Sequence, residues 1–133
     1  MHIVGKIYII FLLMKLADKI LEVEQDYKQF KLVTLGNYLP FKKIGNLVYV
    51  SGQLPIKDEK IITGKVPSET DIKEASYGSR ICMLNTLSML DQLNPSCELS
   101  DFNCIHVAGY VNADHSFSDH PLVINLSLIH ISE

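Results

Sequence analysis

The stretch Gly-Asn-Leu-Val-Tyr-Val-Ser-Gly-Gln-Leu-Pro, residues 45–55, decides the fold class that we expect for this chain. Its central residues, Leu47–Val50, are β-branched, aromatic or aliphatic at every position, as in a strand that is buried on both faces. Gly45-Asn46 is a two-residue connector of the kind that closes a tight hairpin. We therefore predict two antiparallel strands, residues 38–44 and 47–51, with the Ser-Gly-Gln-Leu-Pro segment ending the second.

The longest helix that the sequence predicts runs from about Thr70 to Leu93. Apolar and small residues recur every three or four positions along it, as expected for one stripe that faces a core. The members of this stripe are Ile72, Ala75, Ser79, Met83, Leu87, Leu90 and Leu93. Ser68 and Thr70 are candidate N-cap residues, and Asn94-Pro95 ends the pattern.

Four further segments complete the predicted organisation. Residues 15–30 form an amphipathic helix, residues 104–111 a second buried strand, and residues 58–64 and 112–121 exposed connections. One long helix packed across a small mixed sheet is the simplest arrangement of these elements. The sequence therefore predicts an α+β fold.

The composition is typical of one cytoplasmic domain. The chain has 133 residues, of which 47% are hydrophobic and 20% charged, and 12 basic against 15 acidic side chains give a net charge of −3. No basic run is present, so we expect no nucleic-acid partner. Cys82, Cys97 and Cys104 are odd in number and lack C-x-x-C spacing, which favours reduced thiols over a disulfide framework.

We predict that residues 1–13 are an apolar N-terminal extension that precedes the domain. Ile7–Met14 is an apolar run between Lys6 and Lys15. It is too short for the roughly 20 residues that span a bilayer, and no small-residue cleavage pattern follows it. We therefore expect no membrane partner.

A repeated Asp-His pair occurs in the predicted loop, as Asp114-His115 and Asp119-His120. Two imidazoles and a carboxylate are a common ligand set for a transition metal. A five-residue spacing on a loop fixes no coordination geometry, so solvated loop residues are the simpler interpretation, and we expect no metal site.

Ser51 and Arg80 are the other residues whose chemistry needs interpretation. Ser51 follows a strand and could act as a nucleophile only with a base, for which His106 is the best candidate; lining a pocket or capping a turn is the simpler role. Arg80 is the one arginine of the chain. Arginine is the preferred partner of a carboxylate, although a surface or interface ion pair is the commoner use.

Several blocks of the sequence, in order along the chain, resemble the reactive-intermediate deaminase (RidA, or YjgF-type) family. The most specific is residues 45–55, a strand followed by Ser-Gly-Gln-x-Pro. The other blocks are residues 35–40, residues 80–85, and residues 107–112 followed by Phe117. The resemblance covers residues 14–125.

This resemblance implies a chorismate-mutase-like (ferredoxin-like) α+β subunit and a homotrimer with clefts between subunits. It implies hydrolysis of reactive 2-imino acids, or of their enamine tautomers, to 2-keto acids and ammonia, without a metal or organic cofactor. Carried over by position, Tyr38, Ser51 and Gly52 contact the substrate, and the family's loop asparagine falls near His115. No residue of this chain is assigned as catalytic.

The chain departs from the family after Asn125. The family's carboxylate-binding arginine and a glutamate lie further on, so we expect an incomplete domain that lacks the C-terminal helix and strands, followed by a tail, residues 126–133, outside the family. Deaminase activity is then expected to be impaired. Two other functions stay open: a non-catalytic trimeric module that binds small molecules for regulation, and an endoribonuclease activity, which the acidic balance disfavours.

Overall fold

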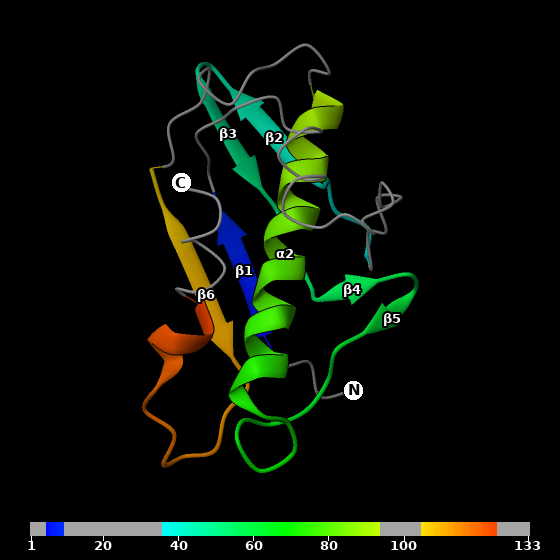
Figure 1. Ribbon diagram of the computed structural model, residues 1–133. Coiled ribbons are helices and arrows are strands. Elements are labelled where there is room, and N and C mark those ends of the chain that lie inside the picture. The colour runs from blue at the N-terminus through cyan, green and yellow to red at the C-terminus, as the bar shows by residue number, and fades with distance from the viewer. Residues whose placement is uncertain (1–4, 10–35, 94–104, 125–133) are drawn as a thin grey trace.

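The computed structural model describes residues 5–9, 36–93 and 105–124, and it has the predicted α+β character. Its elements are β1 (Gly5–Ile9), β2 (Phe41–Ile44), β3 (Leu47–Val50), β4 (Ile56–Lys57), β5 (Lys60–Ile61), α2 (Ile72–Leu93) and β6 (Val107–Val111). Figure 1 shows α2 running along one side of the strands, with the β4–β5 hairpin beyond it. The helix predicted over residues 15–30 and the tail after Asn125 lie outside the described residues.

The predicted hairpin at Gly45-Asn46 is confirmed. β2 and β3 pair antiparallel, from Phe41 opposite Val50 to Ile44 opposite Leu47. Gly45 has a φ of 57°, and glycine at the first central position is typical of the type II′ turn that matches strand twist. The prediction that β3 is buried on both faces is wrong, because Val48 and Val50 are buried while Leu47 and Tyr49 are 40% and 49% exposed. Only one face of this strand packs inward.

The first strand comes from the segment that the sequence assigns to an N-terminal extension. β1 pairs antiparallel with β6 along its whole length, from Gly5 opposite Val111 to Ile9 opposite Val107. β1 also contacts β3 and α2, so it joins the two strand pairs beneath the helix (Figure 1). A short Ile-Tyr-Ile run has strong strand propensity, and pairing with β6 satisfies its backbone.

The expected mixed sheet is not what the described residues form. Three two-stranded sheets are present, β1–β6, β2–β3 and β4–β5, and each is antiparallel. In the described ranges, parallel pairing is confined to the bridge between Val66 and Ala113. The connection predicted at residues 58–64 begins as a tight hairpin instead, in which Asp58 and Glu59 both have positive φ, as a type I′ turn requires.

Helix α2 begins one residue after its cap, and that cap is Asp71. The Asp71 carboxylate Oδ1 accepts a hydrogen bond from the backbone N–H of Glu74 at 2.7 Å, which satisfies one of the orphan donors of the first turn. Ser68 and Thr70 do not cap the helix as predicted. The Ser68 hydroxyl instead donates to Asp114 Oδ1 at 2.9 Å.

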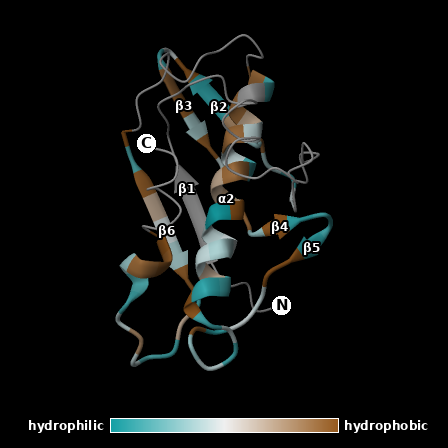
Figure 2. Cartoon of the chain, in the orientation of Figure 1, coloured by the Kyte–Doolittle hydropathy of each residue, from teal (hydrophilic) through white to brown (hydrophobic). Residues whose placement is uncertain are grey.

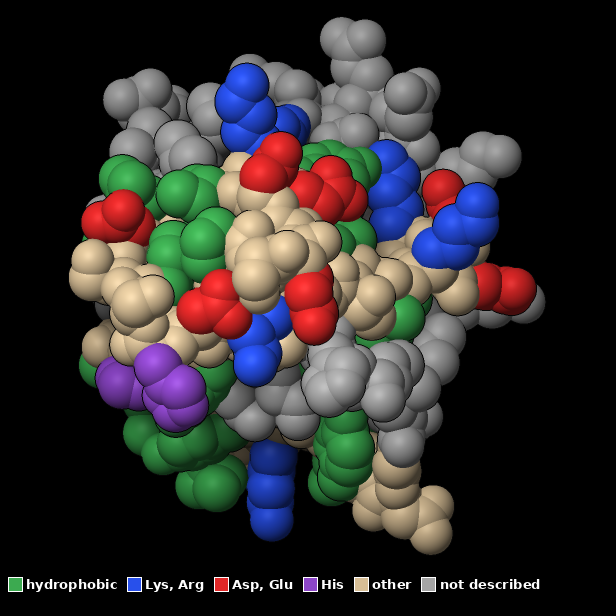
Figure 3. Space-filling view, turned by 90° about the horizontal axis from the view of Figure 1, so that it is seen from below, with side chains coloured by type: hydrophobic (Ala, Val, Ile, Leu, Met, Phe, Trp, Pro, Cys, Tyr) green, Lys and Arg blue, Asp and Glu red, His purple; other side chains and the backbone are tan. Residues whose placement is uncertain are grey.

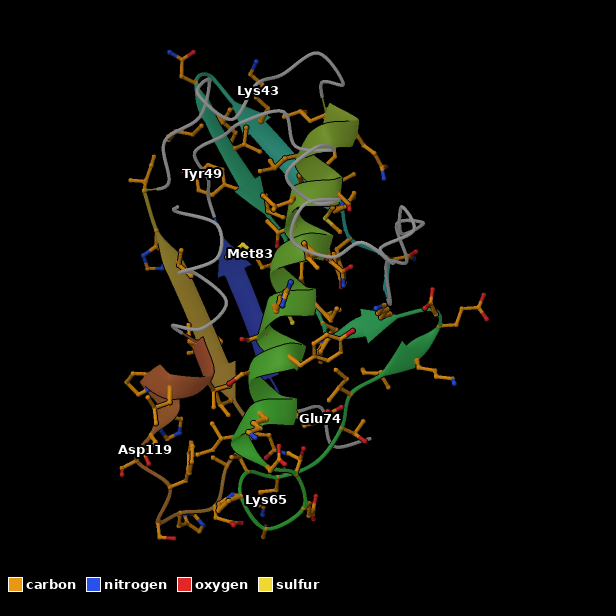
Figure 4. The ribbon with its side chains drawn as sticks, in the orientation of Figure 1. Lys43, Tyr49, Lys65, Glu74, Met83 and Asp119 are labelled. Carbon is orange, nitrogen blue, oxygen red and sulfur yellow. The ribbon has the colours of Figure 1, made fainter. Side chains whose placement is uncertain are left out.

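The predicted core stripe of α2 is confirmed along its centre. Ala75, Ser79, Met83, Leu87 and Leu90 are buried, and the end members of the stripe are half-buried. Met83 points from α2 toward the strands (Figure 4). Hydrophobic residues line β3 and β6 and alternate with hydrophilic ones along α2 (Figure 2).

A second buried row on α2 was not predicted. Ile81 and Leu84 are fully buried and Ser88 is nearly so, at the spacing of three and four that places them on one side of a helix. The helix is therefore buried on more than one side, as a central core helix is. None of the described helices combines the length and apolar character needed to cross a membrane.

The chain after β6 folds back onto α2 and β6. A helical turn at residues 120–124 places the Val123 carbonyl 2.6 Å from the Ser79 hydroxyl, which donates to it. A Cβ added at Gly109 of β6 would lie 2.6 Å from Ile124 Cδ1. Gly109 therefore lets this turn pack closely on the strand.

Candidate functional site

Ser51 is hydrogen-bonded to the segment that follows Tyr38. The Ser51 hydroxyl donates to the carbonyl of Leu39, and the Ser51 backbone N–H donates to the carbonyl of Pro40 at 2.9 Å. Ser51 and Gly52 are half-buried, and Tyr38 is 49% exposed. The sequence-predicted site residues are thus held at one end of the β2–β3 hairpin, with Ser51 bound to the residue next to Tyr38.

Tyr38 is placed by a local turn that depends on Gly36. The Tyr38 backbone N–H donates to the Gly36 carbonyl at 2.9 Å. A Cβ added at Gly36 would lie 3.0 Å from Cε1 of the Tyr38 ring, closer than ordinary carbon contacts. A side chain at position 36 would therefore displace the tyrosine ring.

The hydrogen bond of Ser51 defines what its hydroxyl can do. A hydroxyl has one hydrogen and two acceptor lone pairs, and here the hydrogen goes to a backbone carbonyl. A carbonyl is no general base, and His106, the base considered above, is exposed at the start of the segment that leads into β6. The arrangement favours Ser51 as an acceptor toward a ligand N–H rather than as a nucleophile.

Two amide side chains that sequence reasoning missed hold the segment after Ser51. The buried Gln53 donates through Nε2 to the Ser51 carbonyl at 2.7 Å. Asn85 of α2 donates through Nδ2 to the carbonyls of Leu54 and Ile56 at 3.0 and 3.1 Å. An asparagine that follows the apolar run Ile81–Leu84 of a core helix is the signal that could have found the second of these.

The Asp-His pairs are integrated into loop structure. Asp114 Oδ1 accepts from the Ser68 hydroxyl, and the His120 ring packs edge-on against Phe117 with 5.1 Å between centroids. In the part of the chain that the structure describes, no group of three or more His, Cys, Asp and Glu side chains is arranged to hold a metal ion. His115, at the family's loop-asparagine position, is exposed.

The end of the molecule below α2 carries both signs of charge. Seen from below, its acidic and basic side chains are interspersed rather than separated, and the histidines lie to one side (Figure 3). Lys65, Glu74 and Asp119 all lie toward this end of the molecule (Figure 4). Mixed charge of this kind is typical of a solvated surface.

Arg80 lies on a different side of α2 from the residue that holds the candidate site. It is five residues before Asn85, so the two side chains leave the helix about 140° apart around its axis. The Arg80 side chain is half-buried and makes interactions of its own. Its position favours a structural ion pair or interface role over a clamp at Ser51.

Comparison with known proteins gives structural relatives but no family assignment. No protein-family model and no curated protein matches this chain. The chain is similar to the crystal structure of the protein Atu1372, of unknown function, from Agrobacterium tumefaciens. The two are 26% identical, with a TM-score of 0.64, over 89% of this chain and 71% of that chain. The α+β arrangement described above is thus shared with a solved protein.

Proposed function

We propose that this chain is a chorismate-mutase-like member of the reactive-intermediate deaminase family, which binds reactive 2-imino acids and hydrolyses them to 2-keto acids and ammonia. The observation that carries the proposal is the hydrogen bond from the Ser51 hydroxyl to the Leu39 carbonyl. It brings the Ser-Gly of one family-like block beside the tyrosine of another, although thirteen positions separate them in the sequence. The β2–β3 hairpin and the shared α+β fold support it further.

The chemistry asked of the site is modest. Water adds to the carbon of a protonated C=N bond, and collapse of the adduct releases ammonia and leaves a C=O bond, so atoms balance without a cofactor. Ser51 can accept the iminium N–H because its own hydrogen is committed to Leu39. The half-exposed Tyr38 hydroxyl can donate to the substrate carboxylate. The rate acceleration then comes from holding the imine and the attacking water in the geometry that the reaction needs.

A second candidate, binding without turnover, is favoured by the position of the single arginine. A bidentate arginine is the strongest holder of a carboxylate, and Arg80 leaves α2 on a different side from Asn85. A site with Tyr38 and Ser51 alone would hold the acid less firmly. This is the physical basis for expecting impaired deaminase activity.

The proposal includes a homotrimer in the cytoplasm. Apolar side chains are exposed on one face of the β2–β3 hairpin, namely Ile44, Leu47 and Tyr49. Exposed apolar groups on two paired strands, such as β2 and β3, are the kind of surface that subunits cover. Sedimentation velocity tests this assembly: a species of three chains supports it, and a monomer at every concentration counts against it.

The proposal is tested by ammonia release from freshly generated 2-iminopropanoate, measured above spontaneous hydrolysis, beside thermal shifts with 2-oxopropanoate. Turnover that falls in Tyr38→Phe, with Tyr110→Phe as the matched control on an exposed tyrosine, supports the deaminase. Stabilisation by the keto acid without turnover supports the binding module. The absence of both turnover and stabilisation would contradict both candidates. Turnover that is abolished by Arg80→Ala would make Arg80 the carboxylate clamp.

A further inference from the structure

The segment from the end of β3 to the first residue of β4, residues 51–56, is here called the site segment. Residues 51–55 lie outside the named strands, yet Gln53, Leu54 and Pro55 are buried. Buried carbonyls need hydrogen-bond donors from elsewhere. The Ile62 backbone N–H donates to the carbonyl of Pro55, and side-chain amides donate to the carbonyls of Ser51, Leu54 and Ile56.

Of these donors, Asn85 is the most distant in sequence from the carbonyls that it reaches. From α2 it reaches the carbonyls of both Leu54 and Ile56, at 3.0 and 3.1 Å, across sequence separations of 31 and 29. The Ile56 backbone N–H also donates to Leu54 at 2.8 Å, closing a three-residue turn about Pro55. The single amide nitrogen of Asn85 therefore fixes both ends of this turn against the helix.

A continuous series of contacts runs from Asn85 to the candidate substrate residues. Leu54, held by Asn85, follows Gln53, whose buried amide donates to the Ser51 carbonyl at 2.7 Å. Ser51 in turn donates to Leu39, the neighbour of Tyr38. Each link is either a hydrogen bond or one peptide unit, and the links from Asn85 to Gln53 lie in the buried part of the segment.

We propose that Asn85 is a positioning residue for the candidate site, which holds the site segment on α2 so that Ser51 and Gly52 keep their place beside Tyr38. This inference rests on the proposed function for its ligand. Asn85 touches no substrate; it acts through the backbone of Leu54 and Ile56. Aspartate has the same shape but no N–H to donate, so the two carbonyls would then face an acceptor.

The test compares Asn85→Asp with a matched variant, Asn112→Asp. Asn112 also donates Nδ2 to a backbone carbonyl, that of Gly64 at 3.2 Å, but its contact lies away from the site segment. Affinity for 2-oxobutanoate is measured by titration calorimetry, and amide hydrogen exchange is followed residue by residue in the absence of ligand. Asn85→Ser, which keeps one donor, is carried through the same measurements in case the aspartate does not fold.

We expect Asn85→Asp to weaken keto-acid binding about tenfold or more and Asn112→Asp to leave it within about twofold. Asn85→Ser falls between them. Exchange at Gly52 and Gln53 accelerates in both Asn85 variants while the β2–β3 hairpin keeps its protection. Equal loss of affinity in the Asn85 and Asn112 variants, or unchanged affinity in Asn85→Ser, would overturn the inference.

If the wild-type chain neither hydrolyses 2-iminopropanoate nor binds a keto acid, the proposed function fails, and hydrogen exchange alone then decides the positioning role. Local acceleration at Gly52 and Gln53 in the Asn85 variants would still support it. Exchange that is unchanged, or that rises uniformly over the whole chain, would contradict it. The two failures are therefore distinguishable.

Discussion

Replacement of Gly109 by alanine tests the packing of the helical turn on β6. The new Cβ would lie 2.6 Å from Ile124 Cδ1, 3.1 Å from Cγ1 and 3.5 Å from Cγ2. Ordinary carbon contacts are about 3.5–4.0 Å, so Ile124 must retreat by roughly 1 Å. Overpacking of this kind costs about 1–3 kcal/mol, and removing a strand glycine returns about 0.5–1 kcal/mol. The net expectation for Gly109→Ala is a loss of stability of up to about 2.5 kcal/mol.

The double variant Gly109→Ala/Ile124→Val isolates that contact. Valine lacks Cδ1, the atom of closest approach, and Ile124→Val alone should cost about 0.5–1 kcal/mol at this half-buried position. We expect the double variant to be more stable than the sum of the singles by about 1 kcal/mol. Urea unfolding of the four proteins, followed by circular dichroism, measures this coupling. Additive effects, or a Gly109→Ala protein more stable than the parent, would refute the packing described.

Three further predictions concern the core of α2, its N-terminal cap and the loop that holds the Asp-His pairs. Leu87→Ala removes a fully buried side chain of α2 and should cost about 2–5 kcal/mol, whereas Leu47→Ala, on the exposed face of β3, should cost less than about 1 kcal/mol; equal losses in thermal unfolding would contradict the assigned core. Asp71→Ala removes the α2 cap and should cost about 1 kcal/mol, whereas Asp71→Asn keeps an acceptor and most of the stability; a loss just as large in Asp71→Asn would argue against a capping role. Zinc added to the folded chain should raise the melting temperature by less than about 1 °C, because Asp114 and His120 are engaged with Ser68 and Phe117; a concentration-dependent rise lost in His115→Ala would revive the metal interpretation.

The elements with strong local signals were predictable from the sequence. The hairpin at Gly45-Asn46 has both a turn signal and flanking strand propensity, and the helix to Leu93 has a long unbroken period. Each of these signals is carried by neighbouring residues, which is why periodicity and turn chemistry find them. The same reasoning explains the error at the helix start, where Ser68, Thr70 and Asp71 all have capping side chains and only the backbone path selects among them.

Features that depend on distant pairing were not predictable in this way. Whether Leu47 and Tyr49 are covered depends on what packs against β3, which their own pattern does not reveal. The pairing of β1 with β6 joins residues about a hundred positions apart, and nothing local in an apolar run distinguishes a strand from an extension.

The candidate site was partly predictable for the same reason. Tyr38, Ser51 and Gly52 came from family-like blocks, and the contact between Ser51 and Leu39 brings those blocks together. The supporting amides of Gln53 and Asn85 belong to hydrogen bonds whose acceptors no sequence pattern identifies. Buried polar side chains signal that a partner exists without saying which.

The most direct test of the central claim is an amide-resolved NMR titration of the chain with 2-oxobutanoate. The proposed site predicts saturable shifts concentrated at Tyr38, Ser51 and Gly52, with the loop around Asp114 and His120 unchanged. Tyr38→Phe should weaken the titration, and Tyr110→Phe should leave it as it is. Spectra that do not change up to high ligand concentration, or shifts that gather at the Asp-His loop instead, would contradict the claim.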